Sequence, residues 1–243
     1  MRHQARFVLI ALLFALLSGC GSQQPAATST LTAAPGAELT VFAAASLTGA
    51  FNELASRFSA ANGNATVTFN FAGSDQLAQQ INQGAPADVF ASANNRQMDA
   101  VIQAGDIISG TQRVFARNRL VVVFPADNPG KLQSLQDLAR PGVKIVLAAR
   151  SVPVGGYALD FLDRAARLPE YTESYSETVL KNVVSYEDNV KAVLSKVMLG
   201  EADAGIVYTT DAASVTNGSI ATLAIPDDLN TIAMYPIAAT RGA

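Results

Sequence analysis

Two serines and two short turns stand where an expected strand passes into an expected helix. Ser46 and Ser74 each precede a helical pattern, and residues 152–156 and 188–190 open two more. The first turn of a helix has backbone N–H groups without partners and carries about half a positive charge, and a serine there adds a hydroxyl donor. Several such helix starts around one cleft could bind an anion without any Lys or Arg.

The same residues also have an ordinary structural explanation. Ser46 and Ser74 are of the type that caps helix N-termini, while Gly155 and Gly156 suit turn geometry as well as a close approach to a ligand. Tyr208 ends an apolar strand, where a tyrosine is commonly a half-buried core residue with a solvated hydroxyl. Spacing by itself leaves both interpretations open.

Other kinds of chemistry are excluded by what the chain lacks. Its one histidine is His3 and its one cysteine is Cys20. Both lie in an N-terminal segment that we expect to be removed or modified, so the rest of the chain has neither. Ser-His-Asp and Cys-His catalysis and most zinc or copper sites need these side chains. The 243 residues carry a formal charge of −3, which argues against a basic protein that binds nucleic acid. Carboxylate chemistry, lysine chemistry, oxygen-ligand metals and binding without catalysis stay open.

The elements that must position the candidate residues alternate between strands and helices. Continuous apolar runs at 120–124 and 144–148 are typical of strands that are buried on both faces of a parallel sheet. We expect strands at 39–43, 67–71, 89–90, 120–124, 144–148 and 205–208, and helices at 47–58, 77–81, 98–102, 157–166 and 190–199. This alternation predicts a doubly wound α/β fold in two lobes, with ligands at the carboxyl ends of strands.

The first 37 residues differ in composition from the rest. Arg2 and Arg6 precede an uncharged apolar run at 7–17, so we expect a signal peptide at 1–19. The run ends in Leu-Ser-Gly-Cys20, which resembles the lipobox of bacterial lipoproteins and implies that Cys20 carries lipid. The alternative is ordinary cleavage after small residues. Residues 20–37 are polar and small, which predicts a flexible tether.

Four segments in this order carry a family resemblance. They are Val-Phe-Ala-Ala-Ala-Ser-Leu at 41–47, Phe-Ala-Gly-Ser at 71–74, Gly-Ala-Pro-Ala-Asp-Val-Phe at 84–90 and Gly-Ile-Val-Tyr at 205–208. Together they resemble the extracytoplasmic molybdate-binding proteins of bacterial ABC transporters. The resemblance implies a two-lobed periplasmic-binding-protein fold, with mostly parallel sheets, helices on both faces and a hinge of two crossover strands. Lobe 1 is then expected at 38–117 and 222–243, and lobe 2 at 118–221.

The resemblance also implies the ligand-binding residues. They are the hydroxyls of Ser46, Ser74 and Tyr208 and the backbone N–H groups of Val154 and Val190. Molybdenum is then bound as an oxyanion without a direct bond between protein and metal, and no cofactor or catalytic residue is expected. Asp75 departs from the serine-rich turn of some relatives and brings a carboxylate close to the site, in an orientation that the sequence does not define.

Hydroxyl and N–H donors suit a fully ionised tetrahedral oxyanion, which offers acceptors only. The implied protein is a monomeric, lipid-anchored extracytoplasmic lipoprotein, not an enzyme, which captures molybdate or tungstate and delivers it to an ABC permease. The chain has no GxxxxGK[ST] phosphate loop, so the ATPase subunit would be a separate partner. Two alternatives remain: a binding protein for another tetrahedral oxyanion such as sulfate, and a carboxylate-based hydrolase.

Overall fold

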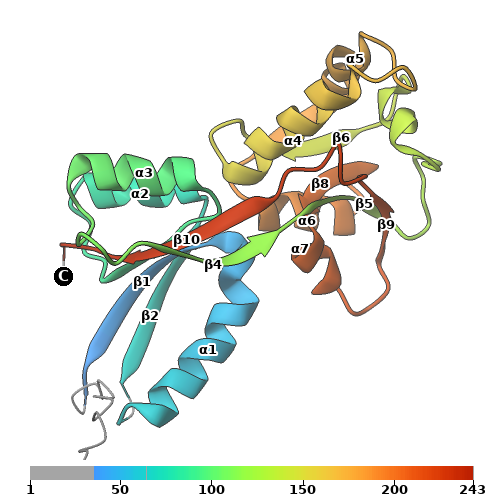
Figure 1. Cartoon of the computed structure of the whole chain (residues 1–243). Coiled ribbons are helices and arrows are strands. Elements are labelled where there is room, and N and C mark those ends of the chain that lie inside the picture. The colour runs from blue at the N-terminus through green and yellow to red at the C-terminus, as the bar shows by residue number, and fades with distance from the viewer. Residues whose placement is uncertain (1–35, 64, 243) are drawn as a thin grey trace, which may run out of the picture. The chain divides into compact units, whose positions relative to one another are not determined.

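Two five-stranded sheets, each with helices on both faces, organise the part of the chain that the structure describes (Figure 1). The computed structural model describes residues 36–63 and 65–242, which belong to one compact unit. The expected signal peptide, Cys20 and all of the expected tether except residues 36 and 37 lie outside them. Within the described residues, no helix has both the length and the apolar character needed to cross a membrane.

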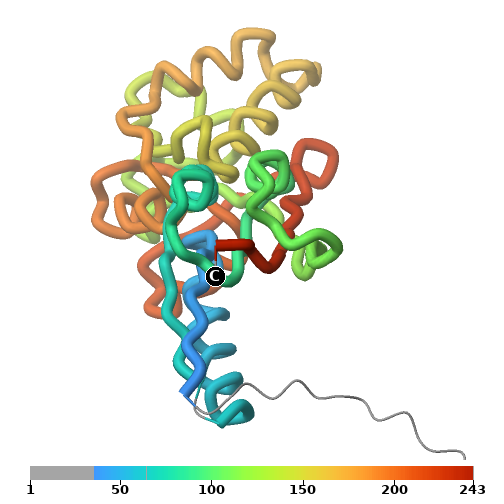
Figure 2. The backbone as a smooth tube through the Cα atoms, turned by 90° about the vertical axis from the view of Figure 1, so that its left-hand side faces the viewer, coloured from blue at the N-terminus to red at the C-terminus, as the bar shows by residue number. Residues whose placement is uncertain are grey.

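The first lobe is built on the sheet with strand order β2-β1-β3-β10-β4. Its strands are β1 (Glu38–Ala44), β2 (Thr66–Ala72), β3 (Val89–Ala91), β4 (Arg113–Asn118) and β10 (Ala233–Ala239). Its helical segments are the 3-10 turn η1 (Ala45–Leu47), α1 (Thr48–Ala61), α2 (Ser74–Asn82) and α3 (Asn95–Ala104). The chain starts and ends its described part in this lobe (Figure 2).

Alternation along β1 explains how helices cover both faces of this sheet. Phe42 points to the cluster that contains Leu77 of α2 and Met98 of α3, whereas Val41 belongs to the cluster on the other face, with Phe51 of α1. The helix expected at 47–58 is present as η1 and α1, but its apolar residues are only partly buried. On α1 itself Phe51 is buried, whereas Leu54 and Phe58 of the same pattern are exposed.

The second lobe is built on the sheet with strand order β7-β6-β8-β5-β9. Its strands are β5 (Leu120–Pro125), β6 (Ile145–Ala148), β7 (Val183–Glu187), β8 (Ala204–Tyr208) and β9 (Ile220–Ala224). Its helices are η2 (Leu135–Ala139), α4 (Pro153–Ala165), α5 (Tyr175–Lys181), α6 (Val190–Met198) and α7 (Thr209–Ala213). Helices α4 and α5 lie on one face of the sheet, and α6 and α7 lie on the other (Figure 1).

The two-lobed α/β fold is confirmed, but the sheets are mixed rather than mostly parallel. In each sheet three strands pair in parallel, and the remaining pairings are antiparallel. Strand β5 was expected to be parallel because of its continuous apolar run, yet it is antiparallel to both β8 and β9. The apolar run of β5 indicates that both faces of the strand are buried, and such burial does not depend on the direction of the strand.

The chain passes between the lobes twice. The first passage is from Asn118, the last residue of β4, to Leu120 of β5, and the second is the segment 225–232 between β9 and β10. The expected return at residue 222 falls inside β9, so the chain leaves the second sheet only after Ala224. Asn230 joins the two passages, because its side-chain amide accepts from the Leu120 N–H at 3.0 Å and donates to the Leu120 carbonyl at 2.9 Å.

Candidate functional site

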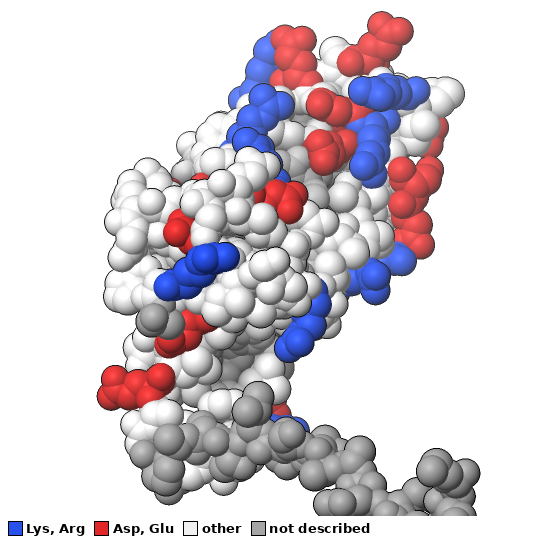
Figure 3. All heavy atoms as spheres, turned by 60° about the vertical axis from the view of Figure 1, so that its left-hand side comes forward, with Lys and Arg blue, Asp and Glu red and all other residues white. Residues whose placement is uncertain are grey.

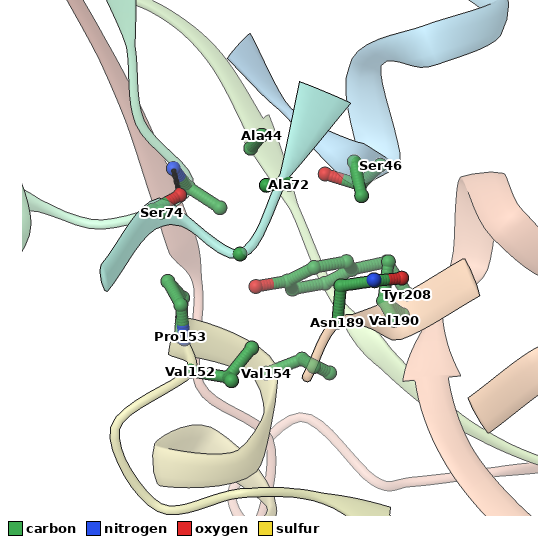
Figure 4. Close-up of a pocket in the computed structure, with 13 residues that line it drawn as sticks. Ala44, Ser46, Ala72, Ser74, Val152, Pro153, Val154, Asn189, Val190 and Tyr208 are labelled. Carbon is green, nitrogen blue, oxygen red and sulfur yellow. Dashed lines mark hydrogen bonds between the residues drawn. The ribbon is translucent and has the colours of Figure 1, made fainter. Parts of the chain in front are cut away.

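One small cavity between the lobes brings together all five residues that the sequence predicted to bind a ligand. Ser46 and Ser74 come from the first lobe, and Val154, Val190 and Tyr208 come from the second. The remaining lining residues are small or apolar apart from one amide: Ala44, Ala45, Ala72, Gly73, Ala93, Val152, Pro153 and Asn189. Figure 4 shows Ser46 and Ser74 on one side, Val152, Pro153 and Val154 on the opposite side, and the Tyr208 ring between them.

The cavity lies where strands end and helices begin. Ser74 starts α2 directly after β2, and Val190 starts α6 after β7. In α4 the first residue is Pro153, which has no N–H, so Val154 is the first residue of that helix that can donate. The N–H groups of a first helical turn have no acceptor inside the helix, so these helix starts present donors to the cavity.

The N-cap interpretation of the two serines is wrong. Ser46 lies inside η1, and Ser74 is the first residue of α2, whose N-cap is Gly73; no side-chain capping bond is made at either start. Instead, the Ser74 Oγ accepts from the Ala93 N–H at 3.0 Å, and the Ser46 Oγ lies 3.1 Å from the Tyr235 hydroxyl. Ser74 therefore keeps its hydroxyl hydrogen for another acceptor.

Tyr208 is a fully buried tyrosine, not the half-buried core residue of the ordinary explanation. It is 1% exposed, and its hydroxyl has no hydrogen-bond partner among the residues that the structure describes. Burial, with smaller effects from Tyr235 and other neighbours, raises the pKa of Tyr208 well above its ordinary value, so the hydroxyl keeps its hydrogen. Figure 4 shows this hydroxyl directed into the space that the lining residues enclose.

Gly155 and Asp75, which the sequence left open, have their own explanations. A side chain at position 155 would overlap the carbonyl oxygens of Ala148 and Ala149, so Gly155 lets α4 pack against the end of β6. Asp75 does not line the cavity. Its Oδ1 is buried beside Gly73, with no hydrogen-bond partner in the described part of the chain.

The site is electrically neutral in its side chains. Among the described residues, no Asp, Glu, Lys or Arg lines the cavity, and no cluster of His, Cys, Asp and Glu suits a metal ion. The Nζ of Lys191, the residue next to Val190, lies 2.9 Å from Oδ1 of the buried Asp211. The negative charge of Asp211 therefore compensates the positive charge of Lys191. On the face in Figure 3, basic and acidic side chains are interspersed rather than gathered by sign. Within the part of the chain that the structure describes, no carboxylate pair lines this cavity, and the face drawn in Figure 3 has no large basic patch.

The size of the cavity limits what it can hold. The centre of a water-sized sphere can move through a volume of about 10 Å³, which corresponds to roughly one water. A sugar, an amino acid or a peptide does not fit in this arrangement of the lobes. Donors without charges and a small volume together suit a compact ligand that accepts hydrogen bonds.

Comparison with known proteins identifies the family. Residues 39–243 match the family described as bacterial extracellular solute-binding protein. The chain belongs to this family. The solute-binding protein is 40% identical over 231 residues to the molybdate-binding protein ModA of Mycobacterium tuberculosis, an alignment that covers 95% of this chain and 83% of the relative. The resemblance stated from the four sequence segments is therefore confirmed.

Solved structures agree with this assignment. The substrate-binding domain of a putative molybdenum ABC transporter from Clostridium difficile has a TM-score of 0.60 and 30% identity, with 86% of each chain covered. The sulfate-binding protein SubI of Mycobacterium tuberculosis superposes on the solute-binding protein with a TM-score of 0.74, over 85% of this chain and 77% of the other. Its identity is only 15%, so this likeness shows the fold alone.

Sequence reasoning missed two residues beside the cavity of the solute-binding protein. Tyr235, from β10, contacts Ser46 through its hydroxyl and packs its ring against the ring of Tyr208, with centroids 5.8 Å apart. Asn118 lies within 3.5 Å of the Tyr235 hydroxyl. No local pattern marks either residue, because both reach the site through pairings between distant strands.

Proposed function

We propose that this protein binds molybdate, and tungstate as well, as a fully ionised oxyanion between its two lobes. One observation carries the proposal: the buried Tyr208 hydroxyl has no partner in the described part of the chain and points into a cavity lined by donors and no charged side chain. A buried donor without an acceptor is costly to a protein, by about 1–3 kcal/mol, so its presence suggests that a ligand supplies the acceptor. Relatives with the name molybdate-binding protein support the choice of anion.

Five donors are proposed to surround the anion. The hydroxyls of Ser46, Ser74 and Tyr208 and the N–H groups of Val154 and Val190 each give one hydrogen bond. The positive ends of α2, α4 and α6 supply the electrostatic attraction that Lys or Arg would supply elsewhere. Because the anion exceeds one water in size, its entry requires small outward shifts of the lining groups.

Sulfate is the second candidate ligand. Sulfate has the same charge and shape as molybdate but shorter bonds, so donor chemistry does not separate the two. Sulfate is the smaller of the two anions, but the cavity, with room for about one water, must widen for either of them. Selection between them therefore depends on how far the donors of the two lobes stand apart when the anion is bound.

The test is calorimetric titration of residues 20–243 with molybdate, tungstate, sulfate and phosphate. We expect molybdate and tungstate to bind with similar affinity and both to bind more tightly than sulfate. Tighter binding of sulfate would transfer the proposal to that anion. No heat with any of the four would contradict an oxyanion site altogether.

Tyr208→Phe makes the test specific to the proposed site. If the hydroxyl serves the ligand, its loss weakens binding by about 1.5–3 kcal/mol, or roughly 10- to 150-fold, as for a hydrogen bond to a charged group. In the absence of ligand the variant should be as stable as the parent or more stable, because the hydroxyl makes no hydrogen bond within the described chain. A loss of ligand-free stability with unchanged affinity would assign Tyr208 to the core instead.

The transport role is part of the proposal. We infer that the loaded protein delivers its anion to an ABC permease that works with a separate ATPase, that it is a monomer without enzymatic activity, and that lipid on Cys20 anchors it outside the cytoplasm. The lipid is tested by fractionating cells that express Cys20→Ser. The variant should leave the membrane fraction, and retention there would exclude Cys20 as the anchor.

A further inference from the structure

The Tyr235 hydroxyl sits behind Ser46 without lining the cavity itself. Tyr235 is 2% exposed, and its hydroxyl lies 3.1 Å from the Ser46 Oγ. On its other side the hydroxyl lies 3.5 Å from the Asn118 Nδ2, a longer contact. Asn118, Tyr235 and Ser46 thus form a continuous row that leads from the first passage between the lobes to the cavity.

Asn118 fixes which group donates and which accepts at one end of this row. Its side-chain Oδ1 accepts from the Arg119 N–H at 3.0 Å and from the Thr209 hydroxyl at 2.9 Å. These two contacts orient the amide, so the Nδ2 faces Thr210 at 2.7 Å and the Tyr235 hydroxyl. An amide nitrogen only donates, so the Tyr235 oxygen accepts from Asn118.

The other end of the row is set by the ligand. A fully ionised oxyanion only accepts, so Ser46 must give its single hydrogen to the anion. The Ser46 oxygen is then the acceptor for Tyr235, which must donate its own hydrogen. Burial raises the pKa of Tyr235, so that hydrogen is present at neutral pH. Only one arrangement satisfies both ends: Asn118 donates to Tyr235, Tyr235 donates to Ser46, and Ser46 donates to the anion.

We propose that Tyr235 is a positioning residue for oxyanion binding, which aims the Ser46 hydrogen at the anion through this one-way donor chain. The inference rests on the proposed function and extends it to residues outside the cavity. Hydrogen bonds in series polarise one another, so the chain also makes Ser46 a stronger donor. Since Thr209 and Thr210 directly follow Tyr208, the chain connects the Ser46 donor of one lobe with the strand that carries the Tyr208 donor of the other.

A double-mutant cycle measured by molybdate titration tests the chain. Tyr235→Phe removes the hydroxyl and should weaken binding about 2- to 10-fold, the effect of one ordinary hydrogen bond. In the Ser46→Ala background the same change should have almost no effect, because Tyr235 acts only through Ser46. Independent, additive effects of the two substitutions would overturn the proposal, and so would an unchanged affinity of Tyr235→Phe.

Tyr175→Phe is the matched control. Tyr175 is equally buried, and its hydroxyl donates to the Leu135 carbonyl within the second lobe, away from the cavity. Its loss should lower stability and leave molybdate affinity as it is. A comparable loss of affinity in this control would show that the effect of Tyr235→Phe is general destabilisation and would overturn the positioning role.

Asn118→Asp offers a second variant, in which the chain is reversed rather than cut. The carboxylate keeps the acceptor for Arg119 and Thr209 but has no hydrogen to donate. Tyr235 then donates to the new carboxylate, and Ser46 donates to Tyr235 instead of to the anion. The loss of affinity should therefore exceed that of Tyr235→Phe, and a smaller loss would contradict the direction. If the parent binds none of the four oxyanions, the proposed function and the chain both fail; if it binds and the cycle is additive, only the chain fails.

Discussion

The three hydroxyl side chains at the cavity share one property: each has a hydrogen that it can donate to a ligand. The Ser74 oxygen is engaged by the Ala93 N–H, Ser46 contacts Tyr235, and the Tyr208 hydroxyl has no partner within the described residues. Each hydroxyl can still donate. An anion that only accepts hydrogen bonds can take the hydrogens of all three hydroxyls.

Replacing the two serines separates their structural contributions from their proposed binding role. Ser46→Ala and Ser74→Ala should each weaken molybdate binding by about 1.5–3 kcal/mol. Ser74→Ala should also lower the free energy of unfolding by about 1–3 kcal/mol, because it leaves the buried Ala93 N–H without its acceptor. Ser46→Ala should lower it by less, about 0.5–1.5 kcal/mol, because the buried Tyr235 hydroxyl loses its contact with Ser46 but keeps the one with Asn118. Urea unfolding without ligand measures the second quantity, and equal losses in the two variants would contradict this assignment.

At the scale of the elements, helix α4 reaches the cavity because it packs unusually close to β6. A Cβ at position 155 would overlap the carbonyl oxygens of Ala148 and Ala149, and the φ of Gly155 is not in the left-handed region. The glycine is required by the small distance between helix and strand, not by turn geometry. This packing places the Val154 N–H at the cavity.

Gly155→Ala should therefore disturb both the lobe and the site. Overpacking of this kind costs about 1–3 kcal/mol of stability, and the displaced helix start should weaken molybdate binding as well. The neighbouring Gly156→Ala is the control, because its added carbon would lie 3.6 Å from the Arg150 carbonyl oxygen, an ordinary contact. It should be neutral or stabilising by up to about 1 kcal/mol, as alanine is favoured inside helices. Thermal unfolding of both variants decides, and equal tolerance at the two positions would refute the close packing.

In the whole molecule, the donors are divided between the lobes, so a ligand that contacts both favours their closed arrangement. The lobes also contact each other directly: the Gln97 side chain donates to the Ser151 carbonyl at 3.2 Å. Gly73 of the first lobe faces the backbone carbonyl of Asp188 in the second, where an added side chain would begin 2.5 Å from that oxygen. A ligand shifts such an equilibrium by its difference in affinity for the two arrangements.

Small-angle scattering should detect this closure as a smaller radius of gyration at saturating molybdate. Gly73→Ala should reduce the response and weaken binding, because the methyl group keeps the lobes apart. Its φ of −58° is accessible to alanine, but the added carbon would also begin 2.7 Å from the buried Asp75 Oδ1 of the same lobe, so a modest loss of ligand-free stability is expected as well. Tyr208→Phe should weaken the response through the lost donor. A radius that stays constant at saturation, with binding shown independently, would rule out closure while leaving the anion site intact.

Local patterns were sufficient for most elements and for the residues around the cavity. The apolar run at 120–124 and the helical spacing at 190–199 predicted β5 and α6 because burial and helical period are properties of short segments. Strand β10 was not predicted, because Pro236 interrupts its pattern; in the structure this proline coincides with a register shift against β4. The family resemblance led to the five lining residues, of which Ser46, Ser74 and Tyr208 lie within the four segments; their part in ligand binding stays a prediction.

The sequence by itself determined which residues can donate hydrogen bonds and that two α/β lobes form. It also predicted ligand-binding residues without a charged side chain. Only the tertiary structure decided that both serines are free of capping, that β5 is antiparallel, and that Tyr235 stands behind Ser46. Ser46 and Tyr235 are 189 positions apart. Their contact depends on the return of β10 to the first sheet after the chain has passed through the whole second lobe, and no local preference of either residue encodes that return.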